Sequence, residues 1–399
     1  MNPKTMSEFA EAIRAVHDPL IALRRDFHRH AELSLQERRT AEVIATRLRQ
    51  AGLDVRTGVG GTGLETGVVA VLHGGKPGRG VMYRADIDAL PIEETKDRPY
   101  ASVNAGAMHA CGHDGHIAIA ITLAEILAAR RSALPGTVVF LFQPAEETMS
   151  GAKPMIAAGV MDNPKVECVL GLHLINQLPV GQAAVRPGPS FAAADFLRVE
   201  VTGKGGHGAM PHLSIDPITV AAHIIVGMQE LVSREVSALE TAVMTFGQVI
   251  AGTKNNIIPE TAELRGTLRT FNTKVQHQLL ERLGSYVSHI AAAYRAQARL
   301  IVEGGIPAVL NHAGMTPKVR ESAARAIGAE NVSDGELLMG SDDMCYFLNE
   351  RPGCYYLIGA AMPGKQMMPH HHPGFDLDER CLEVGLKVSL QAVWDALAG

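Results

Sequence analysis

The spacing of apolar and polar positions along the first half of the chain predicts an open α/β sheet. Two segments near the start carry apolar side chains at helical spacing, and Gly52 follows the second as a helix C-cap. Farther on, short apolar runs predict buried strands, and one long apolar run predicts a buried helix. The expected helices are 7–30, 35–51 and 114–131, and the expected strands are 67–74, 80–86, 137–143 and 166–173. Strands that alternate with helices are typical of a parallel or mixed sheet.

A different pattern lies between two Gly/Pro clusters, "RPGPS" at 186–190 and "EGGIP" at 303–307. It predicts strand 194–202, helix 216–235, strands 241–250 and 260–271, and helix 273–298. This order is typical of a small two-layer α+β domain inserted into a larger one. After the second cluster the α/β character returns, with a strand at 354–359 and a helix at 381–397. We therefore expect one domain from 1–187 plus 307–399, and a second from 188–306.

Composition narrows the classes of protein that fit this pattern. A chain of 399 residues is long for a single core, and 46% hydrophobic with 20% charged residues is an ordinary globular balance. The net charge of −5 and the lack of a long basic run argue against a nucleic-acid partner. Five scattered cysteines form no disulfide framework, and the first residues do not resemble a signal peptide. No apolar run is long enough to span a bilayer. We expect a cytoplasmic protein with reduced thiols and no membrane partner.

Four loops of this predicted sheet contain side chains that could bind a metal ion. They are "HACGHDGH" at 109–116, "QPAEE" after strand 137–143, "GLH" ending at His173, and "PHHHPGFDLDE" at 369–379. Ligands in α/β enzymes tend to lie in the loops that follow the strands. Thiolate, imidazole and carboxylate are the donors that divalent transition metals prefer. Four such clusters, each placed where a strand is expected to stop, therefore indicate a metal centre.

The number of donors favours two metal ions. Cys111, His113, one carboxylate of Glu146 or Glu147, His173 and one of the histidines 370–372 make five protein ligands. A single catalytic zinc takes fewer, whereas two ions about 3.5–4 Å apart can share a bridging ligand. Of two adjacent glutamates, one can bind metal while the other acts as general base on the attacking water.

Most other histidines and cysteines have an ordinary explanation. Cys168 lies in an apolar run and is expected in the core. Two adjacent glutamates, taken alone, would usually lie on the surface of a helix. Cys345, Cys354 and Cys381 have no partner at ligand spacing. The histidines expected to be ordinary are His17, His30, His73, His109, His223, His277 and His312.

The motifs in their order resemble the amidohydrolase branch of the aminoacylase/carboxypeptidase metallopeptidase family. They are "RADIDALPI", "MHACGHDGH", "FQPAEE", "GLH", "GGHGAMPH", "NIIP", "GTLRTF", "MGSDD" and "HHPGFDLDE". The branch includes hippurate hydrolases, N-acyl amino acid amidohydrolases and plant hydrolases of indole-acetyl amino acids. The resemblance implies a zinc-peptidase-like catalytic α/β domain and an inserted ferredoxin-like α+β domain that acts as lid and dimer interface.

Carried over position by position, the resemblance implies a complete ligand set. Cys111 matches the bridging ligand, and Glu146 matches the general base. The terminal ligands would be His113, Glu147, His173 and His371. His370 and His372 would then lie around the ligands, without binding metal, or on the surface. Asp88 matches an aspartate that orients a ligand, and Asp86 replaces a histidine that ligates in the wider family; such carboxylates fix ligand geometry.

The inserted domain carries three further matches. His207 matches a histidine that reaches a partner subunit's active site and polarises the substrate carbonyl. Asn256 and Arg269 match positions that hold the substrate's α-carboxylate. A guanidinium group such as that of Arg269 can form a bidentate hydrogen-bonded pair with a carboxylate. The sequence departs from the branch at Asp342 and Met344, where Glu and Phe are common, and this departure is expected to alter the substrate pocket.

The implied reaction is metal-dependent hydrolysis of the amide of an N-acyl amino acid such as hippurate, in a homodimer with two divalent ions per subunit. Manganese or zinc is expected, and cobalt or nickel would also suit these ligands. Three alternatives stay open: a dipeptidase or carboxypeptidase, a deacetylase of N-acetyl amino acids such as N-acetyl-diaminopimelate, and a non-catalytic metal-binding protein. Loss of Glu146 would mark the last of these, and Glu146 is present.

Overall fold

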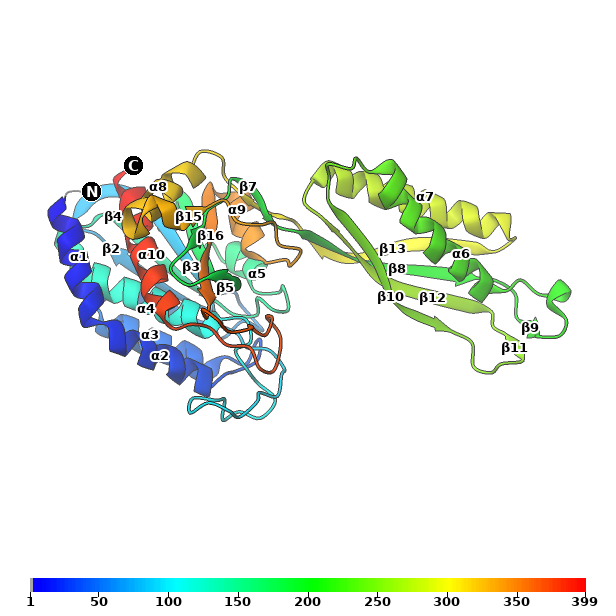
Figure 1. Ribbon diagram of the computed structural model, residues 1–399, viewed down its shortest axis with the longest axis horizontal. Coiled ribbons are helices and arrows are strands. Elements are labelled where there is room, and N and C mark those ends of the chain that lie inside the picture. The colour runs from blue at the N-terminus through cyan, green and yellow to red at the C-terminus, as the bar shows by residue number, and fades with distance from the viewer. Residues whose placement is uncertain (1–2) are drawn as a thin grey trace. The chain divides into compact units, whose positions relative to one another are not determined.

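The computed structural model describes residues 3–399, and the chain divides into two compact units (Figure 1). The large unit contains the chain up to Gly188 together with Leu310–Glu336 and Asp342–Gly399. The inserted unit contains Pro189–Val309 and Leu337–Ser341. Each unit has its own buried apolar cluster. Among the helices described, none has the length and apolar character that a membrane crossing requires.

The large unit is built around an eight-stranded sheet in the order β1-β2-β4-β3-β5-β16-β6-β15. Strands β4, β3, β5 and β16 run parallel to one another, while β2 runs antiparallel to β4. The bounds are β1 Asp54–Thr57, β2 Val68–His73, β3 Lys76–Asp86, β4 Pro135–Gln143, β5 Cys168–Pro179, β6 Ala183–Ala184, β15 Val332–Ser333 and β16 Gly353–Ala361. Two short strands, β7 Gly188–Phe191 and β14 Val309–Asn311, lie at the unit boundary.

Helices cover this sheet (Figure 1). They are α1 Pro3–Ala15, α2 His17–Arg29, α3 Arg38–Gln50, α4 His113–Ala128, α5 Ala152–Ala157, α8 Thr316–Ile327, α9 Met344–Glu350 and α10 Arg380–Ala398. Helices α4 and α10 pack on each other and on β3, and α5 packs on α9. The apolar run "IAIAITLA" makes α4 buried on nearly every side, and β3 is buried from Gly80 to Asp86. Strands buried on both faces explain the continuous apolar runs in the sequence.

The inserted unit is a four-stranded antiparallel sheet, β10-β12-β8-β13, with helices α6 and α7 packed against it. Its elements are β8 Ala193–Thr202, β9 Gly206–His207, α6 Pro217–Glu230, a π-helical turn at Leu231–Glu235, β10 Ala242–Ala251, β11 Ile257–Ile258, β12 Thr261–Thr270, α7 Thr273–Ala293 and β13 Gln297–Ile306. Every second side chain of β8, namely Leu197, Val199 and Val201, points into the core of the inserted unit. The βαββαβ order and the strand order are those of a ferredoxin-like fold, so the predicted fold class is confirmed.

Two helix predictions were wrong for local reasons. The predicted helix 7–30 is two helices that break at Val16, because Pro19 lacks the N–H that a continuous helix would need there. The predicted helix 273–298 ends at Ala293, and strand β13 follows it. Arg295 adopts a left-handed φ of 64° and Ala296 N–H bonds back to the Ala291 carbonyl, which is a Schellman cap without the usual glycine.

Candidate metal centre

The candidate ligands come from four segments of the large unit. Cys111 lies in the loop before α4, and His113 is the first residue of α4. Glu146 and Glu147 lie just beyond β4, and His371 lies in the loop between β16 and α10. The expectation that His173 ends a strand was wrong: β5 continues to Pro179 because residues beyond His173 still pair with β16. His173 therefore projects from the interior of a strand.

The ring of His113 is oriented by the backbone. His113 Nδ1 donates to the carbonyl of Asp88 at 2.9 Å, which leaves the lone pair on Nε2. That Nε2 atom is buried and has no hydrogen-bond partner. It lies 3.9 Å from a carboxylate oxygen of Glu146 and of Glu147. A buried lone pair facing carboxylates is the arrangement that a metal ion satisfies.

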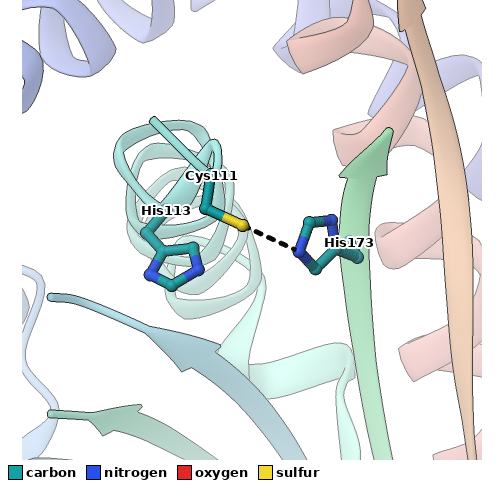
Figure 2. Close-up of side chains that lie close together, drawn as sticks. All are labelled: Cys111, His113 and His173. Carbon is teal, nitrogen blue, oxygen red and sulfur yellow. Dashed lines mark hydrogen bonds between the residues drawn. The ribbon is translucent and has the colours of Figure 1, made fainter. Parts of the chain in front are cut away.

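His173 is held in the same tautomer. Its Nδ1 donates to the Leu174 carbonyl at 2.8 Å, so Nε2 carries the lone pair. Nε2 lies 3.6 Å from Cys111 Sγ, and Figure 2 shows the two side chains facing each other from β5 and the loop before α4. His173 and His113 thus present ligand-ready nitrogens toward one thiol.

Two neighbouring histidines have the opposite tautomer. Leu174 N–H donates to His116 Nε2 at 2.9 Å, so His116 carries its proton on Nδ1 and donates it to Asp86 at 2.6 Å. Asn176 N–H faces His370 Nε2 at 3.4 Å, which likewise puts the His370 proton on Nδ1. Neither ring has a nitrogen lone pair left for a metal ion. Residue type and spacing alone do not separate these two from His113 and His173, and only the family resemblance left them out of the ligand set.

Glu147 and His371 complete the donor set. Glu147 N–H donates to the Asp88 side chain at 3.0 Å, and one carboxylate oxygen of Glu147 lies 3.4 Å from His371 Nε2. The other oxygen is buried without a hydrogen-bond partner. His371 has a left-handed φ of 64° and a half-exposed side chain. The unpartnered oxygen of Glu147 fits a metal ligand.

Two sets of donors share a single residue. Cys111, His113 and His173 form one set, and Cys111, Glu147 and His371 form another, with the ligand atoms of each set within 4.8 Å of one another. A thiolate common to both sets is the arrangement that a bridging ligand requires. The residues present therefore fit two divalent ions, although the role of each residue stays a prediction.

Glu146 lies in a buried acidic environment. Its side chain is 8% exposed and groups with Asp342 and Asp343. Burial, followed by the charges of Asp342, Glu147 and Asp343, holds the pKa of Glu146 well above its ordinary value. Asp342, one of the two departures from the branch motif, therefore lies beside the predicted base. The other departure, Met344, is fully buried and contacts the Gly171 position.

Asp88 and Asp86, the two aspartates expected to orient metal ligands, contact different groups. Asp88 holds His113 through its backbone carbonyl and Glu147 through its side chain. Asp86 instead binds His116 and the buried Arg84, whose guanidinium donates to Asp86 at 2.6 Å and to Asp343 at 2.8 Å. Sequence reasoning missed Arg84, and a lone arginine in the apolar strand β3 was the available signal, because a buried cation needs carboxylate partners.

A second buried network fixes the start of α4. His28 on α2 contacts Asp114 at 2.8 Å and Glu94 at 3.0 Å, and Arg24 pairs with the same Asp114 at 2.7 Å. Burial alone lowers the pKa of His28, but the hydrogen bonds to Asp114 and Glu94 outweigh it, and the pKa lies above its ordinary value of 6.5. The network ties the metal-binding loop to α2 and was not predicted.

We expect this network to make stability depend on pH. Since the folded protein holds the His28 proton more tightly than the unfolded chain, the stabilisation is complete below about pH 6.5 and declines as pH rises through the raised pKa. The difference in Tm between the metal-loaded wild type and His28→Gln should be largest near pH 6 and should shrink toward about pH 9. Thermal denaturation across that range measures it, and a difference that stays constant or grows with pH would contradict the assignment.

The three site residues predicted in the inserted unit are placed at two locations. His207 on β9 pairs with Ile257 on β11, and the Asn256 carbonyl accepts the Gly208 N–H at 2.9 Å, so His207 and Asn256 are neighbours. Arg269 lies at the far end of β12, opposite Ala194, and donates to Ser341 Oγ at 2.7 Å. Within one subunit the inserted unit does not bring Arg269 to Asn256.

Comparison with known proteins agrees with this geometry. Residues 82–395 match the model of peptidase family M20/M25/M40. The chain is 40% identical to N-acetylcysteine deacetylase of Bacillus subtilis, with 94% of this chain and 95% of that protein covered. It is 36% identical to thermostable carboxypeptidase 2 of Saccharolobus solfataricus, with 94% of each covered. The structure of the YXEP protein of Bacillus subtilis, described as a dinuclear metal binding peptidase, matches with a TM-score of 0.85 at 36% identity, over 96% of this chain and 99% of that one. This chain is therefore a member of peptidase family M20/M25/M40 and a metal-dependent amidohydrolase.

Proposed function

We propose that this enzyme hydrolyses the amide bond of N-acyl amino acids that carry a free carboxylate, and releases a carboxylic acid and an amino acid. The observation that carries the proposal is the set of fixed imidazole lone pairs that converge on Cys111 beside the buried Glu146. Divalent ions bound there supply Lewis-acid activation of the acyl carbonyl and of the attacking water.

Glu146 performs the proton transfers. Its position 3.9 Å from His113 Nε2 lets it take the proton from a water attacking at the centre. It then delivers that proton to the leaving amine, so that the carboxyl group returns to its starting state. Its raised pKa suits both steps, because the base must accept a proton readily and release it in the same turnover.

His207 has the tautomer that oxyanion stabilisation needs. Ala209 N–H donates to His207 Nδ1 at 3.1 Å, so the proton lies on Nε2, and the side chain is exposed. An exposed Nε2–H can donate to the developing oxyanion of the substrate. Asn256 beside it and Arg269 at the other end of β12 are the groups assigned to the substrate carboxylate.

We infer that a homodimer assembles the full substrate site. A carboxylate cannot contact Asn256 and Arg269 of the same inserted unit, since they lie at opposite ends of β12, so one of them would come from a second copy. Exposed apolar side chains on the inserted unit support such an interface. They are Ile218, Val226, Val243, Val249, Ile250 and Ile257.

The test is a substrate panel with the metal-reconstituted enzyme. Chelation should abolish hydrolysis of hippurate and N-acetyl amino acids, and manganese, zinc, cobalt or nickel should restore it. The amide analogue hippuramide, which lacks the free carboxylate, is the matched control and should be hydrolysed much more slowly. Equal rates on hippurate and hippuramide would contradict the carboxylate requirement.

The second candidate is a carboxypeptidase or dipeptidase. The similarity to thermostable carboxypeptidase 2 favours it, and the same centre would perform the chemistry on a peptide. Dipeptides in the same panel separate the two functions. Hydrolysis of dipeptides in preference to every N-acyl amino acid, N-acetyl-diaminopimelate included, would replace the proposed function with this one.

A further inference from the structure

His370 occupies a position beside Cys111 that no ligand assignment uses. Its Nδ1 lies 3.6 Å from Cys111 Sγ, the same distance that separates Sγ from His173 Nε2. The ring packs against Phe375 with ring centres 4.8 Å apart. Its other nitrogen, Nε2, faces the N–H of Asn176 on β5. The Asn176 side chain also donates to the Met368 carbonyl at 2.7 Å, which ties the loop to the strand.

The hydrogen-bond partner of His370 Nε2 determines whether Nδ1 carries a proton. A ring that accepts a hydrogen bond at Nε2 is neutral and carries its single proton on Nδ1. A protonated Nδ1 cannot bind a metal ion, so His370 is excluded as a ligand. It can donate, and the atom within reach is the sulfur of Cys111. His173 approaches the same sulfur with a lone pair instead, because its own Nδ1 proton goes to Leu174.

We propose that His370 is a positioning residue that donates an N–H···S hydrogen bond to the bridging thiolate of Cys111 and so sets its strength as a metal ligand. The inference rests on the metal centre of the proposed function. The hydrogen bond withdraws charge from the sulfur, which affects the charge-transfer absorption. It also fixes the thiolate in its place in the ligand set, and we expect this positioning to favour metal binding by more than the withdrawn charge opposes it. Groups that orient a ligand in this way typically change metal affinity by about 10–100-fold when they are removed.

Two amide variants that differ by one methylene group separate hydrogen-bond donation from packing. In His370→Asn the amide nitrogen replaces Nδ1 and keeps a donor near Cys111. In His370→Gln the amide oxygen replaces Nε2 as the acceptor of the Asn176 N–H, and the sulfur is left without a donor. His370→Leu removes every donor and is a second variant in case the glutamine side chain disturbs the loop. The matched control is His372→Asn, since His372 is exposed and its Nδ1 accepts the nearby Gly374 N–H.

The measurement is the thiolate-to-cobalt charge-transfer absorption of the cobalt-loaded protein, together with the Kd for cobalt. We expect the band to move to longer wavelength and Kd to rise about 10–100-fold in His370→Gln and His370→Leu. His370→Asn and His372→Asn should match the wild type. An unchanged band and Kd in both the glutamine and leucine variants would overturn the proposal. A wild type that binds cobalt with no charge-transfer band would instead remove Cys111 from the centre, which is a failure of the metal assignment itself.

Discussion

Replacing Glu146 by glutamine is expected to lower kcat by about 10²–10⁴-fold while two metal ions per subunit are retained. Glutamine keeps the volume of the buried side chain but cannot take a proton from water. Glu146 lies 3.9 Å from His113 Nε2 and groups with Asp342 and Asp343, but it belongs to neither of the two donor sets that contain Cys111, so its carboxylate is available for proton transfer. Steady-state kinetics and metal analysis of the same preparation measure both quantities.

Glu147→Gln is the control for this result. The two glutamates are adjacent, but Glu147 also approaches His371 and has a buried oxygen without a partner. Its replacement should reduce metal content as well as rate. If Glu146→Gln lost metal and Glu147→Gln retained it, the two roles would have to be exchanged.

Replacing Cys111 by serine is expected to reduce metal content below two ions per subunit and to reduce activity by at least about 10³-fold, beyond the range typical of a lost supporting contact. Cys111 is the one residue common to both donor sets, so its loss affects both ion positions. A serine hydroxyl remains protonated at neutral pH and is a poor bridge between cations. Metal analysis and activity at saturating added metal provide the measurement.

Cys168→Ala is the matched control for the thiol. Cys168 is 4% exposed at the start of β5 and belongs to the apolar core. Its replacement should leave metal content and kcat unchanged, with a modest loss in Tm. Full metal content and near-normal activity in Cys111→Ser would show that the two ions are joined by another ligand.

The fold was predictable wherever side chains repeat with a clear period. The run that forms α4 and the alternation along β8 are examples, and both elements lie within three residues of their predicted bounds. The errors arose where backbone conformation determines the outcome. Arg295 ends α7 in a conformation usually marked by glycine, so no residue signalled the start of β13. Helices α8 and α9 were not predicted. The buried residues of α8 are Thr316, Val319, Ser322 and Ala323, which make no clear apolar stripe, and α9 has only 7 residues, too few to show a helical period.

The site was predictable as a list of residue types and unpredictable as a set of hydrogen bonds. The crowding of "CGHDGH" and the tandem glutamates indicated metal binding from sequence. The tautomers of His113, His116 and His370 depend on a carbonyl or an N–H from residues 25 to 194 positions away. Such partners are set by sheet register and loop packing, which no local pattern encodes.

The backbone hydrogen bonds of His113 and His173 have a consequence for metal exchange. Carbonyls of Asp88 and Leu174 belong to the folded chain and stay with the rings whether or not an ion is bound. The side-chain entropy of ordering these ligands is therefore lost during folding and not during metal binding. Ion affinity then depends mainly on the ion's own coordination preference, and one metal should replace another without partial unfolding of the protein.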